Sequence, residues 1–377
     1  MSASQRHAHS GQARAVHYQG HEIPIYRAAL PGGGRSPLLK AMLTTACERH
    51  CRYCSFQSGR DMRRVTLQPE EMAAVYHEAY AHGLVQGLFL STGLFGGGAN
   101  TQNKLLDCAR LLRGRHSYRG YIHLKLMPGS EFGQVQRAME LADRVSINLE
   151  APNPARLERL APEKQFSSEL LDPLRWAARI RRERSPQGAY KGRWASTSTQ
   201  FVVGAAGESD VELLSTAEKL LKDLGVRRTY FEAFSPVPGT PFEHLPAENP
   251  IRQQRLYEAS YLLRDYGYDL EDLSFGPDGR LPLGMDPKRG YAELHLTHHP
   301  VELNQADREQ LLRVPGIGHV GSERILQGRT QHRLTDLSQL RQMGIVAERA
   351  APYILLDGRS PTHQLPLFPS EELQALR

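Results

Sequence analysis

Apolar runs and amphipathic stretches alternate along the chain from about residue 37 to residue 240. Six short apolar runs rich in β-forming residues predict strands at 38–45, 87–93, 121–127, 144–150, 198–204 and 228–234. Helical periodicity predicts amphipathic helices between them, at 69–83, 102–115, 132–142, 167–184 and 209–225. Repeated β–α units are typical of a parallel sheet. Six β runs rather than eight predict an α/β fold with a partial, TIM-like (β/α)6 barrel.

Two of these strands indicate which face of the sheet holds the chemistry. Their apolar positions are Ile122, Leu124, Leu126, Val145, Ile147 and Leu149. Their alternating polar positions are His123, Lys125, Ser146, Asn148 and Glu150. Because successive side chains of a strand point to opposite faces, the apolar set is expected to face the helices. The polar set then lines a reaction chamber; half-exposed strands are the alternative interpretation.

The chain divides by composition into five segments. We expect an N-terminal extension at 1–36, the partial barrel at 37–245, and a helical and loop connector at 246–299 that includes a helix at 251–267. A small all-α module follows at 300–358. The tail at 359–377 is expected to be flexible.

Composition narrows the class of protein. The chain has 377 residues, 40% of them hydrophobic and 23% charged, which is ordinary for a soluble domain. The sequence has no apolar run long enough to span a bilayer and no apolar signal segment, so we expect a cytoplasmic protein without membrane contact. A net charge of +6 favours an anionic partner, which makes an association with the nucleoid an option.

Three of the four cysteines stand close together. Cys47, Cys51 and Cys54 lie within eight residues, whereas Cys108 is isolated in a helical stretch and is expected to be an ordinary buried thiol. Four-iron clusters are held by cysteine thiolates, usually four of them, so three would leave one iron open. A zinc site is the alternative, with His50 as the fourth ligand.

The C-x3-C-x2-C spacing directly after the first predicted strand resembles the radical S-adenosylmethionine (SAM) superfamily. The resemblance implies a [4Fe-4S] cluster whose open iron binds the amino and carboxylate groups of SAM. It also implies that the cluster donates an electron that cleaves SAM to a 5'-deoxyadenosyl radical. Tyr53 occupies the aromatic position common in this motif, so it is expected to lie near the adenine.

Later strand ends match further SAM-contacting segments of that superfamily. The resemblance assigns the amino group of SAM to the first segment, the ribose to the second and the adenine to the third. Their residues are Ser91, Thr92 and Gly93; Asn148 and Glu150; and Val203, Gly204 and Gly207. Barrel-type active sites assemble at this end of the strands, and a carboxylate can accept hydrogen bonds from two ribose hydroxyls.

A narrower resemblance covers residues 37 to 358. The segments "GYIHLKLMPG", "ADRVSINLEAP", "RLAPEK", "STQFVVGA" and "LLRVPGIG" are similar to radical SAM proteins of DNA modification or repair that end in a helix-hairpin-helix. That family implies a uracil-DNA-glycosylase-like partner protein. An external electron donor, such as a flavodoxin or ferredoxin, is a further expected partner. The N-terminus and the loop "FGGGANTQNK" depart from the family.

The segment "NQADREQLLRVPGIGHVGSERILQGR" predicts two short helices joined by "PGIG", with Asn304 as the cap of the first. Gly316, Ile317 and Gly318 would present N–H groups to a DNA phosphate at the start of the second helix. The expected phosphate-binding cations are Arg313, Arg324 and Arg329. Such contacts would be non-specific and salt-sensitive. A packing hairpin is the alternative.

The tail contains "QLPLF", which resembles the peptide that docks bacterial repair proteins on the sliding clamp. Its expected contact residues are Gln364, Leu365, Leu367 and Phe368.

These observations predict a radical SAM enzyme that modifies or repairs DNA. His123, Lys125 and Glu232 are the candidate residues facing the target nucleotide, which is expected to be flipped or single-stranded. One alternative is a radical SAM enzyme that modifies RNA. The other is a non-catalytic iron-sulfur protein that binds DNA and assists a partner.

Overall fold

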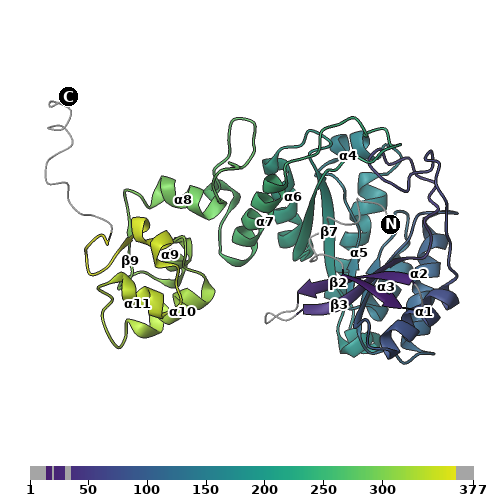
Figure 1. Cartoon of the computed structure of the whole chain (residues 1–377), viewed down its shortest axis with the longest axis horizontal. Coiled ribbons are helices and arrows are strands. Elements are labelled where there is room, and N and C mark those ends of the chain that lie inside the picture. Colours follow the sequence, from purple (N-terminus) through teal and green to yellow (C-terminus); the bar gives the residue numbers. More distant parts are fainter. Residues whose placement is uncertain (1–13, 19–20, 30–34, 362–377) are drawn as a thin grey trace. The chain divides into compact units, whose positions relative to one another are not determined.

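The structure of this protein is a computed structural model that describes residues 14–18, 21–29 and 35–361. The chain forms two compact units, Met1–Tyr257 and Glu258–Arg377 (Figure 1). The clamp-like peptide 364–368 lies outside the described residues. No helix in the described ranges is both long enough and apolar enough to cross a membrane.

The first unit contains an eight-stranded sheet in the order β1 to β8, which is also the order of the strands along the chain. Strands β1 and β2 form an antiparallel hairpin, and β2 pairs antiparallel with β3. From β3 to β8 every pairing is parallel. The strands are Arg14–Tyr18, His21–Ala29, Arg35–Met42, Gly87–Ser91, Tyr121–Lys125, Arg144–Ser146, Ser196–Val203 and Arg228–Ala233. The six predicted strands are therefore confirmed as one parallel sheet.

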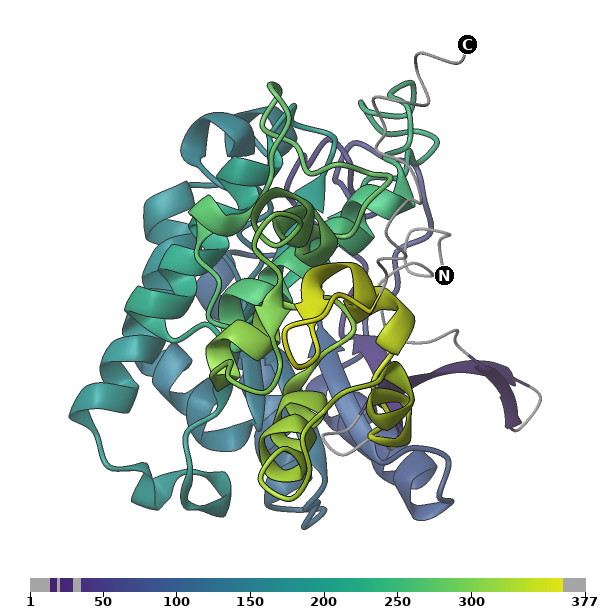
Figure 2. The same cartoon turned by 90° about the vertical axis from the view of Figure 1, so that its left-hand side faces the viewer.

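The helices of this unit follow the strands in a β–α alternation. They are α1 Pro69–Ala81, α2 Gly98–Arg113, α3 Phe132–Leu141, α4 Pro154–Leu160, α5 Asp172–Glu183, α6 Asp210–Leu224 and α7 Pro250–Asp265. A π-helical turn, η2 Phe166–Leu171, leads into α5. Helices α1, α2, α3, α5 and α6 pack side by side in chain order along the sheet (Figure 2). Their arrangement confirms the predicted α/β architecture.

The predicted apolar positions of the β5 and β6 segments are buried, and the polar side chains of His123, Ser146 and Glu150 are buried as well, so burial alone does not separate the two faces. Ile122, Leu124 and Leu149 are fully buried, as expected for side chains packed under the helices. Each such side chain contributes about 1.5–3 kcal/mol of transfer free energy. On the other face the polar side chains hydrogen-bond to one another rather than to helices: His123 contacts Ser146 at 2.8 Å.

The structure adds to or differs from the expectations in three places. Within the expected N-terminal extension, β1 and β2 add a hairpin to the edge of the sheet (Figure 2). Strand β6 ends at Ser146, earlier than expected; beyond it Glu150 has a positive φ of 64° and forms only an isolated bridge with Phe201. The short helix α4 was not expected; Asn153 caps it by accepting a hydrogen bond from the Arg156 amide.

The second unit consists of short helices and a small parallel strand pair. Its elements are α8 Pro287–His295, β9 Val301–Glu302, α9 Arg308–Arg313, α10 His319–Gly328, α11 Leu337–Gln342, α12 Ala347–Ala350 and β10 Ile354–Leu355. The β9–β10 pair means that the 300–358 segment is not purely helical, in contrast to the expectation. Leu311, Val314, Ile317 and Ile325 share one buried core.

Two short helices flank the "PGIG" turn as predicted, α9 before it and α10 after it. The expected cap, however, is wrong. Asp307 caps α9, because its side chain accepts the Gln310 amide at 2.8 Å. The Asn304 side chain instead donates to the Leu334 carbonyl and accepts from the Leu334 amide, both at 2.9 Å, and so joins two loops.

Candidate active site

The three clustered cysteines lie on one loop that begins where β3 ends, at the carboxyl edge of the parallel sheet. Cys51 is buried, and Cys47 and Cys54 are partly buried. All four cysteines of the chain are free thiols. Burial raises the pKa of Cys54 to about 12, so a ligand that binds this thiolate must displace a proton. Cys108 is fully buried inside α2, as expected for an ordinary core thiol.

One arginine holds the cysteine loop in shape. Arg64 donates hydrogen bonds from Nη1 to the carbonyl oxygens of Thr45 and Phe56, at 2.7 and 2.8 Å. Its Nη2 donates to the carbonyls of Gln57 and Arg60, at 2.7 and 3.1 Å. A guanidinium is a rigid, permanently charged fork of donors, so it fixes loop carbonyls that no strand partner reaches. Arg64 therefore holds the loop in shape through four backbone carbonyls.

The predicted segment Ser91–Gly93 lies directly beside this loop. The Gly93 amide donates to the Thr44 carbonyl at 2.7 Å. A Cβ at Gly93 would lie 2.1 Å from the Ala46 carbonyl oxygen, so no other residue fits here without moving the cysteine loop. The Thr92 side chain is buried and bonds the Gly93 carbonyl. The close approach of the Ser91–Gly93 segment to the cysteine loop thus requires glycine at position 93.

Glu150 is the charged centre of the site. Lys164 Nζ lies 2.9 Å from Glu150 Oε1, and the two side chains are only 11% and 6% exposed. Tyr53 lies beside the Glu150 carboxylate and helps to lower its pKa. Burial by itself would raise the pKa of Glu150, but Lys164 and Lys125 lower it, so the carboxylate is ionised. Of the predicted SAM contacts, Tyr53 and Glu150 are thus brought together.

The polar face of the barrel carries the predicted substrate-facing residues. Lys125 donates a hydrogen bond to the Asn148 amide oxygen, and burial lowers its pKa to about 8. Burial also holds the pKa of His123 well below its usual range, so this imidazole is neutral. Gln200 donates to the Glu232 carboxylate at 2.5 Å, and burial raises the pKa of Glu232. The face therefore offers both donors and acceptors.

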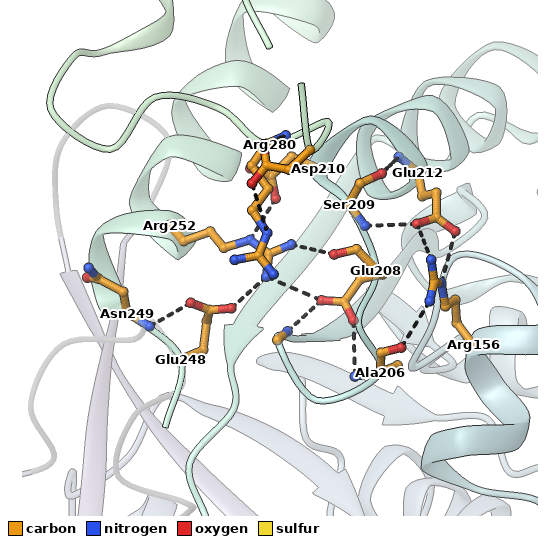
Figure 3. Close-up of polar contacts among 12 residues, drawn as sticks. Arg156, Ala206, Glu208, Ser209, Asp210, Glu212, Glu248, Asn249, Arg252 and Arg280 are labelled. Atoms are coloured by element: carbon orange, nitrogen blue, oxygen red, sulfur yellow. Dashed lines mark hydrogen bonds and ion pairs between the residues drawn. The ribbon is translucent and has the colours of Figure 1, made fainter. Parts of the chain in front are cut away.

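The loop after β7 is held by a buried ion cluster that was not predicted. The Glu208 carboxylate accepts hydrogen bonds from the amides of Gly204 and Ala206. Arg252 of α7 lies among Glu208, Asp210 and Glu248 (Figure 3). Gly204 and Gly207 both have positive φ, which glycine adopts without strain. Glu208 and Arg252 thus fix the backbone of the segment from Val203 to Gly207, which is expected to contact the adenine.

Three residues of the site were missed by sequence reasoning: Lys164, Glu208 and Arg252. Lys164 ends the "RLAPEK" segment, which was noticed only as a family resemblance. Glu208 follows Gly207 directly, and its position after a glycine-containing strand end was a usable signal. Arg252 lies in a predicted helix, and nothing in its local pattern indicates that it reaches the β7 loop.

The second unit uses the predicted phosphate-binding arginines internally. Arg313 bonds Asp272 and the Gly267 carbonyl, and lies over the Tyr268 ring. Arg329 donates to the carbonyls of Leu303 and Ala306. Arg324 donates to the Met343 carbonyl at 2.6 Å. These contacts stabilise the module, and a role of the three cations in binding phosphate stays a prediction.

The glycines of the turn have a definite structural role. Gly316 has a φ of 85°, and a Cβ there would lie 2.6 Å from the Val346 carbonyl oxygen. Gly318 is the N-cap of α10, and Ile317 is buried between them. The turn therefore keeps the start of α10 close to the 344–346 turn, whose Gly344 also has a positive φ.

The residues at the cysteine loop fit a [4Fe-4S] cluster. Three free thiols on one loop can supply three thiolates, and the fourth cysteine, Cys108, is fully buried in α2. Lys164 lies close enough to oppose the burial-driven rise in the Cys51 pKa, as suits a site for thiolates. In the described ranges, no three His, Cys, Asp or Glu side chains converge on a single metal-ion position.

Comparisons with known proteins agree with this site. Residues 42–220 match the family model described as "Radical SAM superfamily". A tRNA-2-methylthio-N(6)-dimethylallyladenosine synthase of Vibrio parahaemolyticus is 30% identical over 99 residues, 26% of this chain and 21% of the relative. The same-named protein of Pseudomonas savastanoi pv. phaseolicola is 23% identical over 257 residues, 66% of this chain and 55% of the relative. The chain thus spans about a fifth to a half of these relatives.

Parts of two solved structures also resemble this chain. The crystal structure of a methylornithine synthase aligns with a TM-score of 0.47 at 14% identity, covering 73% of this chain and 68% of the other. A radical SAM methyltransferase from Sphaerobacter thermophilus aligns with a TM-score of 0.45 at 15% identity, covering 67% and 74%.

Proposed function

Because residues 42–220 match the family model of the radical SAM superfamily, we propose that this protein is a radical SAM enzyme that modifies or repairs DNA. The observation that carries the proposal is the loop with Cys47, Cys51 and Cys54 at the carboxyl edge of the sheet, next to the Glu150 carboxylate. Barrel enzymes assemble their active sites at this edge.

The chain's residues have distinct tasks in this proposal. Cys47, Cys51 and Cys54 would hold three irons of a [4Fe-4S] cluster and leave the fourth open to SAM. Such a cluster, reduced by an external donor, would supply the one-electron reductive cleavage of bound SAM. Glu150, paired with Lys164, would accept hydrogen bonds from the ribose hydroxyls. The segments Ser91–Gly93 and Val203–Gly207 contact the amino group and the adenine.

The polar face of the sheet is proposed to receive the target nucleotide. Neutral His123 and protonated Lys125 can donate hydrogen bonds, and Glu232 with Gln200 offers an acceptor and a donor. Proteins recognise the edge of a base through hydrogen-bond donors and acceptors of this kind. A base that stays paired inside a duplex cannot reach the interior of a barrel. A flipped or unpaired nucleotide is therefore the proposed substrate.

The second unit supports nucleic acid as the substrate class. Its α9–turn–α10 pair is proposed to be a helix-hairpin-helix that holds the phosphate backbone, with amide N–H groups at the start of α10. Binding would then be independent of sequence and weaken with salt. A sliding clamp, reached through Gln364–Phe368, and a uracil-DNA-glycosylase-like protein are the proposed partners.

RNA is the second candidate substrate. Two relatives are named tRNA-modifying synthases, and one of them aligns with 66% of this chain. That alignment favours a tRNA-like substrate over other RNAs. A DNA-binding accessory protein with a non-catalytic cluster is the remaining alternative.

One experiment separates these functions. The protein is reconstituted with iron and sulfide without oxygen, reduced, and incubated with SAM alone, with duplex or single-stranded DNA, or with tRNA. 5'-Deoxyadenosine is quantified by mass spectrometry. Release stimulated by DNA supports the main proposal, and release stimulated by tRNA alone replaces DNA with RNA. No release from protein that carries a reducible cluster supports the accessory function. The Cys51→Ser variant is the negative control, and Cys108→Ser is the matched control for loss of a thiol.

A further inference from the structure

The segment that follows α4 is fastened to both sides of Cys51. The Arg52 amide donates to the Leu160 carbonyl at 2.8 Å. The His50 amide donates to the Glu163 carboxylate at 3.1 Å, and Arg49 donates to the Glu163 carbonyl. The residues just before and just after Cys51 are thus bonded to 160–163. Lys164 is the next residue of this segment, so its backbone lies beside the cysteine loop.

The Lys164 side chain extends from this segment to Glu150, and its charge also opposes the burial-driven rise in the pKa of Cys51. Its ammonium lies 2.9 Å from Glu150 Oε1, in an environment where both side chains are almost fully buried. Burying an ion pair has a desolvation cost that the pair itself often fails to offset. Glu150 also holds a strained backbone with φ 64°. A buried pair on a strained residue indicates a functional arrangement more than a stabilising one.

We propose that Lys164 is a positioning residue that couples the cysteine loop to the Glu150 carboxylate, orienting this carboxylate for the SAM ribose and placing a fixed positive charge beside the Cys51 thiolate. The inference deepens the proposed function and rests on it. Nothing in the "RLAPEK" segment other than Lys164 reaches Glu150 through a side chain among the described contacts.

The geometry gives Lys164 two separable effects. First, Lys164 donates to Glu150 Oε1 at 2.9 Å and Asn148 Nδ2 donates to Oε2 at 3.5 Å, so the remaining lone pairs of the carboxylate keep one direction. A preorganised acceptor binds a diol with less loss of side-chain freedom.

Second, one-electron reduction adds a negative charge to a cluster. A nearby ammonium stabilises that charge, because interactions inside a protein are weakly screened. Lys164 therefore favours the reduced cluster.

The test uses full-length protein with a reconstituted cluster and needs no nucleic acid. Lys164→Met, Lys164→Arg and Glu150→Gln are compared with the unmodified protein. Iron content, the SAM dissociation constant by isothermal titration, and the cluster midpoint potential by EPR-monitored titration are measured. We expect Lys164→Met to weaken SAM binding about tenfold or more, as for loss of a charged hydrogen bond. Its midpoint potential is expected to be more negative. Lys164→Arg, which keeps the charge, is expected to retain a potential near that of the unmodified protein.

Arg113→Met is the matched control. Arg113 forms a buried pair with Asp143, and their side chains are 8% and 5% exposed. Asp143 directly precedes β6, so this pair lies at the amino edge of the sheet, opposite the cysteine loop. The control is expected to lose stability but to keep the SAM dissociation constant and the potential. If Lys164→Met does not fold, SAM affinity and midpoint potential are compared among Glu150→Gln, Lys164→Arg and the unmodified protein instead.

Two results separate this inference from the proposed function. Unmodified protein that holds a cluster and cleaves SAM, together with variants at 164 that match it in SAM affinity and in potential, overturns the role of Lys164 alone. Weakened SAM binding in the Arg113 control equal to that in Lys164→Met also overturns it, because the effect is then general loss of stability. Unmodified protein that assembles no cluster overturns the proposed function itself.

Discussion

Arg252 of α7 donates a 2.8 Å hydrogen bond to the Glu208 backbone carbonyl while its guanidinium also bonds Asp210 and Glu248. The Arg252 and Glu208 side chains are 2% and 0% exposed. The loop after β7 is thus held by a cation that comes from a distant part of the chain.

Arg252→Met is expected to lower the free energy of unfolding by about 3–5 kcal/mol, because it leaves three carboxylates without their buried cation. Urea denaturation monitored by circular dichroism measures this loss. Arg110→Met is the control, because Arg110 and its paired Asp107 are both largely exposed in α2. An Arg252 variant as stable as the control contradicts the role of the ion cluster.

Gly93→Ala is expected to displace the cysteine loop, because the new Cβ would lie 2.1 Å from the Ala46 carbonyl oxygen. We expect a large fall in iron and sulfide bound per chain, measured after anaerobic reconstitution. Gly133→Ala in α3 meets no atom within 4 Å and is the matched control. That control is expected to bind iron normally and to be slightly more stable, by about 0.5–1 kcal/mol. Equal iron content in both variants would contradict the claim that the cysteine loop depends on the close approach of Gly93 to Ala46.

Replacing any one of Cys47, Cys51 and Cys54 with serine is expected to abolish a stable cluster, since a serine hydroxyl does not replace a thiolate at an iron. Iron content and the visible absorption band measure the effect. Cys108→Ser is expected to keep the cluster and to lose stability only, because Cys108 is fully buried within α2. A cluster that survives loss of Cys51 contradicts the ligand assignment.

Lys288 is expected to make the second unit more stable as the pH rises from about 7 to 10.5. Burial lowers its pKa to about 7, from 10.5 in the unfolded chain, with Arg349 adding to this and Asp286 opposing it. Below pH 7 both states bind the proton, and between the two values only the unfolded state does. The slope of the unfolding free energy with pH is then positive and at most about 1.4 kcal/mol per unit.

Comparison of the unmodified protein with Lys288→Met by urea denaturation from pH 6 to 9.5 isolates this term. The difference in stability between the two is expected to rise with pH above 7. Lys222→Met, at a side chain that is 60% exposed, is the control and is expected to give a flat difference. A flat difference for Lys288 as well would refute the assignment.

Gly316→Ala is expected to weaken nucleic-acid binding about tenfold, because the added Cβ meets the Val346 carbonyl at 2.6 Å and φ is positive. Fluorescence anisotropy with duplex DNA and with tRNA, at two salt concentrations, measures the change. Gly284→Ala, which meets no atom within 4 Å, is the control. Unchanged affinity in a folded Gly316 variant would falsify binding through this turn.

Local periodicity was enough to predict the six parallel strands and five of the helices between them, because side-chain alternation and amphipathic faces are properties of neighbouring residues. The three cysteine positions and the partners His123, Lys125, Asn148 and Glu150 were also visible in the sequence, since each belongs to a short motif or to one face of a strand. Gly93, Gly204 and Gly207 were visible in motifs. The atoms around them and their backbone angles, which only the structure gives, explain why glycine is required at these positions.

Only the tertiary structure decided which charges meet. Lys164 bonds Glu150 across 14 residues, and Arg252 bonds Asp210 across 42. Such pairs form because packed elements bring distant chain segments together, and no local pattern records that approach. The same holds for Arg313 and Arg329, which the sequence suggested for phosphate and the fold bonds to its own carboxylate and carbonyls. Sequence determined the chemistry available at the carboxyl edge of the sheet, and folding determined its partners.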